Sequence, residues 1–147
     1  MGSLSLPATG TVYVDAQLFI YEVRDRQPYQ ALFEPLWRAL DAGHLSVVTS
    51  ALTWLEVLVH PLRDEDADLQ RAFGDALTRA GVRVEPITLD ILRAAARLRA
   101  DVPSLRTPDA IHAATAQLTR CDVLISHDPA FRSVPGLNHL YLGDITT

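Results

Sequence analysis

The sequence predicts an α/β protein with three layers, in which helices cover both faces of a central, mostly parallel sheet of four to five strands. Short runs rich in β-branched residues alternate along the chain with longer helical patterns, which is the order that parallel β-α-β units produce. The expected strands are residues 11–14, 45–49, 82–84, 122–126 and 140–142. The fourth run is almost continuously apolar, as expected of a strand buried on both faces.

Helical patterns fill the intervals between these strands. We expect helices over residues 16–24, 31–40, 64–80 and 89–100, one that follows a Ser50 cap, and one that begins near Thr107. In the helix after Ser50, Leu52, Leu55 and Val59 share one stripe with Glu56, and Pro61 should end it. Residues 1–10 are expected to form a loose lead-in to a single domain spanning residues 1–147.

Composition narrows the class of protein. Of 147 residues, 48% are hydrophobic and 21% are charged, which is typical of a globular protein, and no apolar run is long enough to span a membrane. The single cysteine, Cys121, excludes an internal disulfide and a cysteine-based zinc cluster, so we expect a cytoplasmic protein. The net charge of −5 disfavours a protein that coats nucleic acid, but a nuclease remains possible if metal ions and placed arginines reverse the local field.

Residues 106–116 contain the most informative helix start. Thr107 is a good N-cap, Pro108 suits the first helical position, and Asp109 then lies where the helix dipole favours a carboxylate. Ala113, Ala114 and Ala116 keep the helix slim enough to pack closely on a sheet. A carboxylate that only stabilises a helix end would explain Asp109 in isolation.

Three further carboxylates occupy related places. Asp15 and Asp128 follow predicted strands, and Glu56 lies near the start of a helix on its packed stripe. At one edge of a parallel sheet these groups would repel one another, and a hard cation would offset that repulsion. Ligands that are all oxygen indicate Mg²⁺ or Mn²⁺, which activates water in phosphodiester hydrolysis.

Four segments together resemble the PIN-domain ribonucleases, and within them the VapC-type toxins of bacterial toxin–antitoxin pairs. They are residues 12–15, 53–57, 108–116 and 126–131. The resemblance implies a PIN-like fold and a Mg²⁺- or Mn²⁺-dependent endoribonuclease whose acids match Asp15, Glu56, Asp109 and Asp128. It also implies an RNA substrate, a homodimer, and a small VapB-like antitoxin that covers the site.

Roles within this set remain partly open. Asp15 and Asp109 are the expected direct metal ligands, Asp128 binds directly or through water, and Glu56 is a ligand or orients the attacking water. Additional candidates for substrate contacts are Arg24, Arg106, His112, His127 and Arg132. Each of the arginines could instead be a solvated surface charge, and His112 could be a packed, hydrogen-bonded histidine.

Other functions fit less well. A phosphatase of the haloacid dehalogenase type needs a second Asp where Gln17 stands and a lysine, which the chain lacks. The sequence contains neither a Gly-x-Ser-x-Gly elbow nor a phosphate loop of the Walker type. A PIN-like binding module without activity and a housekeeping RNA-processing nuclease remain alternatives.

Overall fold

The computed structural model describes residues 2–146, and residue 146 without its side chain. Within this range, five strands form one sheet in the order β3-β2-β1-β4-β5, and each neighbouring pair is parallel. The strands are β1 (Gly10–Val14), β2 (Leu45–Ser50), β3 (Val82–Glu85), β4 (Val123–Ser126) and β5 (His139–Tyr141). The predicted parallel sheet is therefore confirmed.

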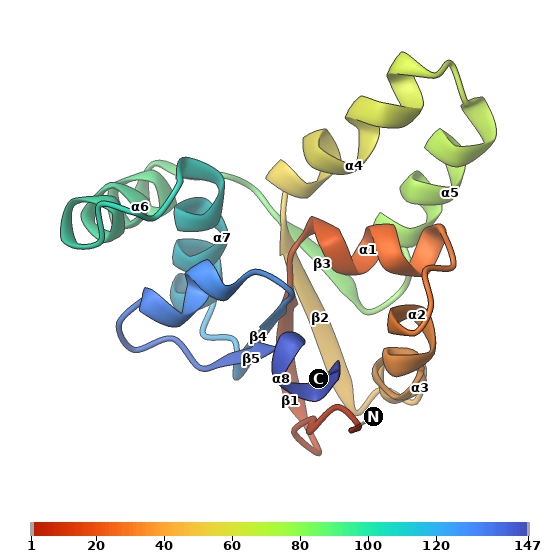
Figure 1. Ribbon diagram of the computed structural model, residues 1–147, viewed down its shortest axis with the longest axis horizontal. Coiled ribbons are helices and arrows are strands. Elements are labelled where there is room, and N and C mark those ends of the chain that lie inside the picture. The colour runs from red at the N-terminus through yellow and green to blue at the C-terminus, as the bar shows by residue number, and fades with distance from the viewer. Residues whose placement is uncertain (1, 147) are drawn as a thin grey trace.

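Helices cover both faces of this sheet, so the three-layer prediction is also confirmed (Figure 1). On one side lie α1 (Ala16–Val23), α2 (Tyr29–Leu32), α3 (Glu34–Asp41), α4 (Leu52–Arg63) and α5 (Ala67–Leu77). On the other side lie α6 (Leu89–Asp101) and α7 (Thr107–Leu118). The short elements are the 3₁₀ turn η1 (Pro129–Ser133) and α8 (Gly143–Thr146).

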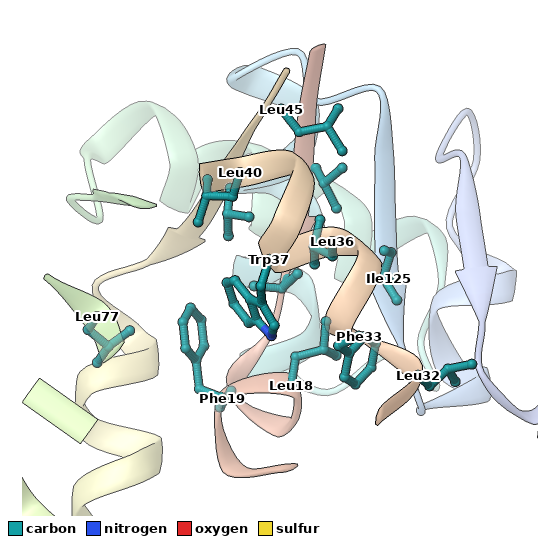
Figure 2. Packing of buried hydrophobic residues seen from close by; sticks show 14 of the residues in the cluster. Leu18, Phe19, Leu32, Phe33, Leu36, Trp37, Leu40, Leu45, Leu77 and Ile125 are labelled. Atoms are coloured by element: carbon teal, nitrogen blue, oxygen red, sulfur yellow. The ribbon is translucent and has the colours of Figure 1, made fainter. Parts of the chain in front are cut away.

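Alternation along β1 separates two hydrophobic cores. Val12 and Val14 face the core formed with α1 and α3, whereas Tyr13 faces the core formed with α6 and α7. In the first core, Phe19 and Trp37 lie next to one another with ring centroids 6.2 Å apart (Figure 2). The small residues of α7, including Ala113, are fully buried and let this helix pack closely against the sheet.

Several helix boundaries differ from the prediction. The helix expected over 31–40 is two helices that meet at Phe33, and α5 begins only after Asp66, whose carboxylate accepts a hydrogen bond from the Leu69 N–H (3.0 Å). Pro61 does not end α4, which continues to Arg63, because proline in the last turn removes only one helical hydrogen bond.

The predicted stripe of α4 is also wrong. Leu55 is 63% exposed, and the buried face is formed instead by Thr53, Val57 and Pro61. The Thr53 hydroxyl pairs with that of Thr49 at 2.7 Å, so a polar residue that hydropathy assigns to the surface is buried against β2. Ser50 does accept a hydrogen bond from the Leu52 N–H (3.1 Å), although Ala51 is the N-cap residue.

The chain before β1 contacts the rest of the fold at several points, although residues 2–9 form no helix or strand. Leu4 and Leu6 pack against the first core, and the Gly2 N–H donates to the Ile145 carbonyl (3.2 Å). Gly10 already belongs to β1, with φ at +117°, and a side chain there would collide with Asp122. Among residues 2–146, no helix is both long and apolar enough to cross a membrane.

Candidate active site

The four predicted acids meet in one cavity at the carboxyl ends of the strands. Asp15 directly follows β1, Asp128 lies two residues after β4, and Glu56 and Asp109 project from α4 and α7. All four line a cavity of about 430 Å³. Parallel strands place their following segments at the same edge, which explains why residues so distant in the chain come together.

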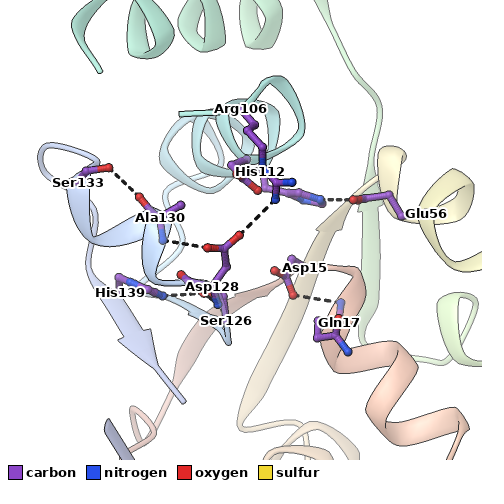
Figure 3. Close-up of polar contacts among 11 residues, drawn as sticks. Asp15, Gln17, Glu56, Arg106, His112, Ser126, Asp128, Ala130, Ser133 and His139 are labelled. Atoms are coloured by element: carbon purple, nitrogen blue, oxygen red, sulfur yellow. Dashed lines mark hydrogen bonds and ion pairs between the residues drawn. The ribbon is translucent and has the colours of Figure 1, made fainter. Parts of the chain in front are cut away.

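Asp15 forms no ion pair with an arginine or histidine within residues 2–146. It is the N-cap of α1, and its Oδ1 accepts a hydrogen bond from the Gln17 N–H (3.2 Å; Figure 3). Burial, followed by the charges of Glu56 and Asp128, raises the pKa of Asp15 from 3.8 to about 6. The ionised form of Asp15 is therefore costly in this fold unless a cation approaches it.

Asp109 and Asp128 share one guanidinium. Arg106 Nε lies 3.3 Å from Asp109 Oδ2. Arg106 Nη2 lies 3.5 Å from Asp128 Oδ2, and Figure 3 shows these two side chains pointing toward one another. Burial and the nearby charge of Asp128 raise the pKa of Asp109, which is 6% exposed. Arg106 is largely solvent-exposed, so it offsets this repulsion only in part.

Local hydrogen bonds fix the positions of this pair. Asp128 caps η1 through the Ala130 N–H (2.9 Å), and its own N–H donates to the Ser126 hydroxyl (3.3 Å). Arg106, rather than the predicted Thr107, is the N-cap residue of α7. The Thr107 hydroxyl instead accepts a hydrogen bond from Arg99 of the neighbouring helix (2.9 Å).

Glu56 is held by a chain of buried polar groups. Its Oε1 lies 2.6 Å from His112 Nε2, and His112 Nδ1 lies 2.6 Å from the Tyr13 hydroxyl. Burial raises the pKa of Tyr13 well above its usual value, so the hydroxyl stays protonated in its hydrogen bond with Nδ1. The other ring nitrogen of His112, Nε2, contacts Glu56 Oε1, and the Glu56 side chain lines the cavity.

The donor set suits a hard divalent cation. Carboxylate oxygens are the ligands that Mg²⁺ and Mn²⁺ prefer, and burial together with the charges of Glu56 and Asp128 raises the pKa of Asp15, so a cation bound there would stabilise its ionised form. Among residues 2–146, however, no three Asp, Glu, His or Cys side chains stand at the spacing of a formed metal site. In this conformation Arg106 supplies the positive charge between Asp109 and Asp128.

Only some of the residues predicted to contact the substrate line the carboxylate cavity. Arg106, His112 and His127 line the cavity, whereas Arg24 lies in an adjoining cavity of about 270 Å³. Arg132 lines neither of these cavities, because it pairs with Asp144 and lies over the Tyr141 ring, 4.3 Å from its centroid.

Sequence reasoning missed several residues of the site, among them Tyr13, His60 and Tyr21. Tyr13 supports His112, and His60 and Tyr21 line the cavity. Two of them carry a simple signal: Tyr13 precedes Asp15 by two residues, so strand alternation puts both on one face, and His60 follows Glu56 by one helical turn. Tyr21 carries no such local signal.

Comparison with known proteins decides the family. The PIN domain family model matches residues 12–137, which is most of the chain. The chain belongs to the PIN domain family. No curated protein matches the sequence.

Solved structures similar to this PIN domain include several toxin–antitoxin proteins. VapBC-1 from nontypeable Haemophilus influenzae matches with a TM-score of 0.72 and 17% identity, over 90% of this chain and 98% of that one. VapC20 from Mycobacterium tuberculosis, a sarcin-ricin loop cleaving toxin, matches with a TM-score of 0.69 and 19% identity, over 88% and 98%. A toxin–antitoxin complex from Klebsiella pneumoniae shows 28% identity and a TM-score of 0.65, over 86% and 94%.

These matches confirm the PIN-like fold and the resemblance to VapC toxins that the four sequence segments indicated.

Proposed function

We propose that this PIN domain protein is a Mg²⁺- or Mn²⁺-dependent endoribonuclease that acts as the toxin of a VapBC-type toxin–antitoxin pair. The observation that carries the proposal is the convergence of Asp15, Glu56, Asp109 and Asp128 in one cavity. A protein with only a structural role would gain nothing from burying like charges together. The family and the structural neighbours support the same conclusion.

We assign the metal to Asp15, Asp109 and Asp128. The bound ion would supply a nucleophilic water and stabilise the leaving oxygen of an RNA phosphodiester. Glu56 is a further ligand or orients the attacking water; its side chain lines the cavity, and His112 holds its Oε1. His112 thus serves Glu56 rather than the substrate, while Arg106 is placed to meet a phosphate.

Two protein partners belong to this proposal. The Klebsiella neighbour is a toxin–antitoxin complex and another neighbour is a VapBC protein, so we expect a small VapB-like antitoxin to cover the cavity of this chain. We also expect a homodimer, as the family resemblance implies.

A PIN-like binding module without activity is the second candidate. One observation favours it: Arg106 already neutralises part of the charge of Asp109 and Asp128. A housekeeping RNA-processing nuclease would share the chemistry of a toxin but would not arrest growth when expressed alone.

Cleavage of total cellular RNA tests the proposal. The purified protein is incubated with Mg²⁺, Mn²⁺ or EDTA, and the new RNA ends are mapped. We expect cleavage only with a divalent ion. We also expect a loss of at least 100-fold in Asp109→Asn, since the bound ion stabilises the transition state by several kcal/mol and the variant would hold the ion less well. Asp90→Asn is the matched control, because Asp90 occupies the first turn of α6 without lining the cavity.

Absence of cleavage with either ion would overturn the enzymatic proposal and favour the binding module. Cleavage without growth arrest on expression would retain the nuclease and remove the toxin role. Full activity in Asp109→Asn would remove the site assignment.

A further inference from the structure

Tyr21 and His127 line the carboxylate cavity, and the Tyr29 ring packs against both of them; all three rings are half-buried. Tyr21 and Tyr29 stack with ring centroids 4.4 Å apart and planes inclined by 16°. The His127 ring lies 4.9 Å from that of Tyr29, and its Nδ1 lies 2.8 Å from the Tyr21 hydroxyl. Because the stack and the hydrogen bond act together, the orientation of the Tyr21 ring is fixed.

A second cavity, of about 290 Å³, adjoins the carboxylate cavity at Tyr21. Its walls are formed by Gln17, Ile20, Tyr21, Arg26, Gln27 and Tyr29. Gln17, Ile20 and Tyr21 also line the carboxylate cavity, so the two spaces share this wall. Helix α1 begins at the carboxyl end of β1, directly after Asp15, and runs toward α2 (Figure 1). A flat group against Tyr21 would therefore lie immediately beside the acids.

Two uncompensated arginines flank the same rim. Arg24 and Arg26 are exposed, and among residues 2–146 neither forms an ion pair with a carboxylate. Asp64 lines the adjoining cavity with them but pairs with neither. Seven arginines elsewhere do form such pairs: Arg38, Arg71, Arg79, Arg83, Arg97, Arg106 and Arg132. Although the chain has a net charge of −5, the guanidinium groups of Arg24 and Arg26 are therefore available to bind an anion.

We propose that the Tyr21 ring is a stacking platform for one nucleobase of a single-stranded RNA, and that Arg24 and Arg26 contact the phosphates next to it. The proposal rests on the ribonuclease function proposed above and adds a substrate subsite to it. Single-stranded RNA is recognised by bases stacked on aromatic rings and by arginines on the backbone, and this rim offers both. The stacked nucleotide would place a neighbouring phosphodiester over the four carboxylates.

Binding measured by fluorescence anisotropy tests the subsite apart from catalysis. The probes are a labelled 12-nucleotide RNA of mixed sequence and an abasic oligomer of equal length, in Ca²⁺, with the RNA checked for integrity afterwards. Tyr21→Leu should weaken binding of the RNA by about tenfold, the loss of one stacked base, and leave binding of the abasic oligomer unchanged. Tyr21→Trp, which retains a ring, should bind RNA like the parent.

Replacement of Arg24 and Arg26 should change RNA binding in a different way from replacement of Tyr21. Replacement of both Arg24 and Arg26 by Gln should weaken binding of both probes and flatten its dependence on salt, because backbone contacts do not require a base. Arg93→Gln is the matched control: Arg93 is exposed on α6, forms no ion pair within residues 2–146, and lines neither rim cavity. It should change neither measurement.

Equal binding of RNA by the parent and Tyr21→Leu would overturn the subsite, as would a failure of Tyr21→Trp to retain binding. An equal loss for the abasic oligomer would show that Tyr21 acts through the fold and would also overturn it. If Tyr21→Leu instead lost only the binding of an antitoxin, the rim would be a protein-docking surface. If the parent cleaves RNA and Tyr21→Leu binds RNA normally, the ribonuclease proposal stands and the subsite proposal is wrong. If the parent neither binds nor cleaves RNA, both proposals are wrong.

Discussion

Asp15→Asn should stabilise the metal-free protein at neutral pH. The pKa of Asp15 is raised from 3.8 to about 6, and one pKa unit corresponds to ~1.36 kcal/mol, so ionisation of this group costs up to about 3 kcal/mol. Solvent screens part of that cost because Asp15 is not completely buried, and we expect a gain of about 2 kcal/mol on neutralisation. Asn preserves the N-cap, since its carbonyl oxygen also accepts from the Gln17 N–H.

The sign of the pH dependence follows from proton uptake. Between pH 3.8 and about 6 the folded chain binds more protons at Asp15 than the unfolded chain does, so this group lowers stability as pH rises through that window. The advantage of Asp15→Asn should therefore be complete above pH 7 and fall to about a third at pH 4.5.

Thermal unfolding by circular dichroism in EDTA measures the effect. At this chain length ~1 kcal/mol shifts Tm by about 4 °C, so the variant should melt about 8 °C higher than the parent at pH 8. Asp66→Asn is the control, because Asp66 caps α5 in the same way but is exposed. Mn²⁺ should raise the Tm of the parent more than that of Asp15→Asn. A variant that melts no higher than the parent at pH 8 would refute the reasoning that buried like charges await a cation.

Two further predictions concern the groups around Asp15. Tyr13→Phe should cost about 1 to 2 kcal/mol of stability and weaken Mn²⁺ binding, because His112 loses the hydroxyl that holds it, as measured by urea unfolding and calorimetric titration. Arg106→Gln should cost about 1 kcal/mol in EDTA, because it leaves Asp109 and Asp128 without their shared cation, and saturating Mn²⁺ should remove the difference.

Each of these variants has a control within the chain. Tyr141→Phe removes a hydroxyl from a half-buried ring in β5 and should leave Mn²⁺ binding unchanged. Arg38→Gln breaks the exposed pair with Glu34, whose loss should cost far less than 1 kcal/mol and should not respond to Mn²⁺. Unchanged Mn²⁺ affinity in Tyr13→Phe, or a stability loss in Arg106→Gln that persists with Mn²⁺, would contradict the roles assigned to these residues.

Local pattern accounts for most of the fold. Alternation and apolar runs located all five strands within a residue or two. The signal is clearest in β4, whose four residues are all buried, as a central strand of a parallel sheet requires. Errors arose where a neighbour changed the outcome: Thr107 looked like a cap, but Arg99 engages its hydroxyl, and Leu55 looked like core, but α4 turns Thr53 inward. A helix pattern indicates that one face is buried, and only the packing partner selects which one.

The sequence alone determined the order of strands and helices along the chain. It also determined that four acids lie beside strand ends or in early helical turns, because both results depend on the local periodicity of the sequence. Only the tertiary structure decided what each acid touches: Arg106 between Asp109 and Asp128, and Tyr13 behind His112. It also decided the raised pKa of Asp15. Such contacts join segments far apart in the chain, and their energies depend on through-space distance and burial, which a linear pattern does not contain.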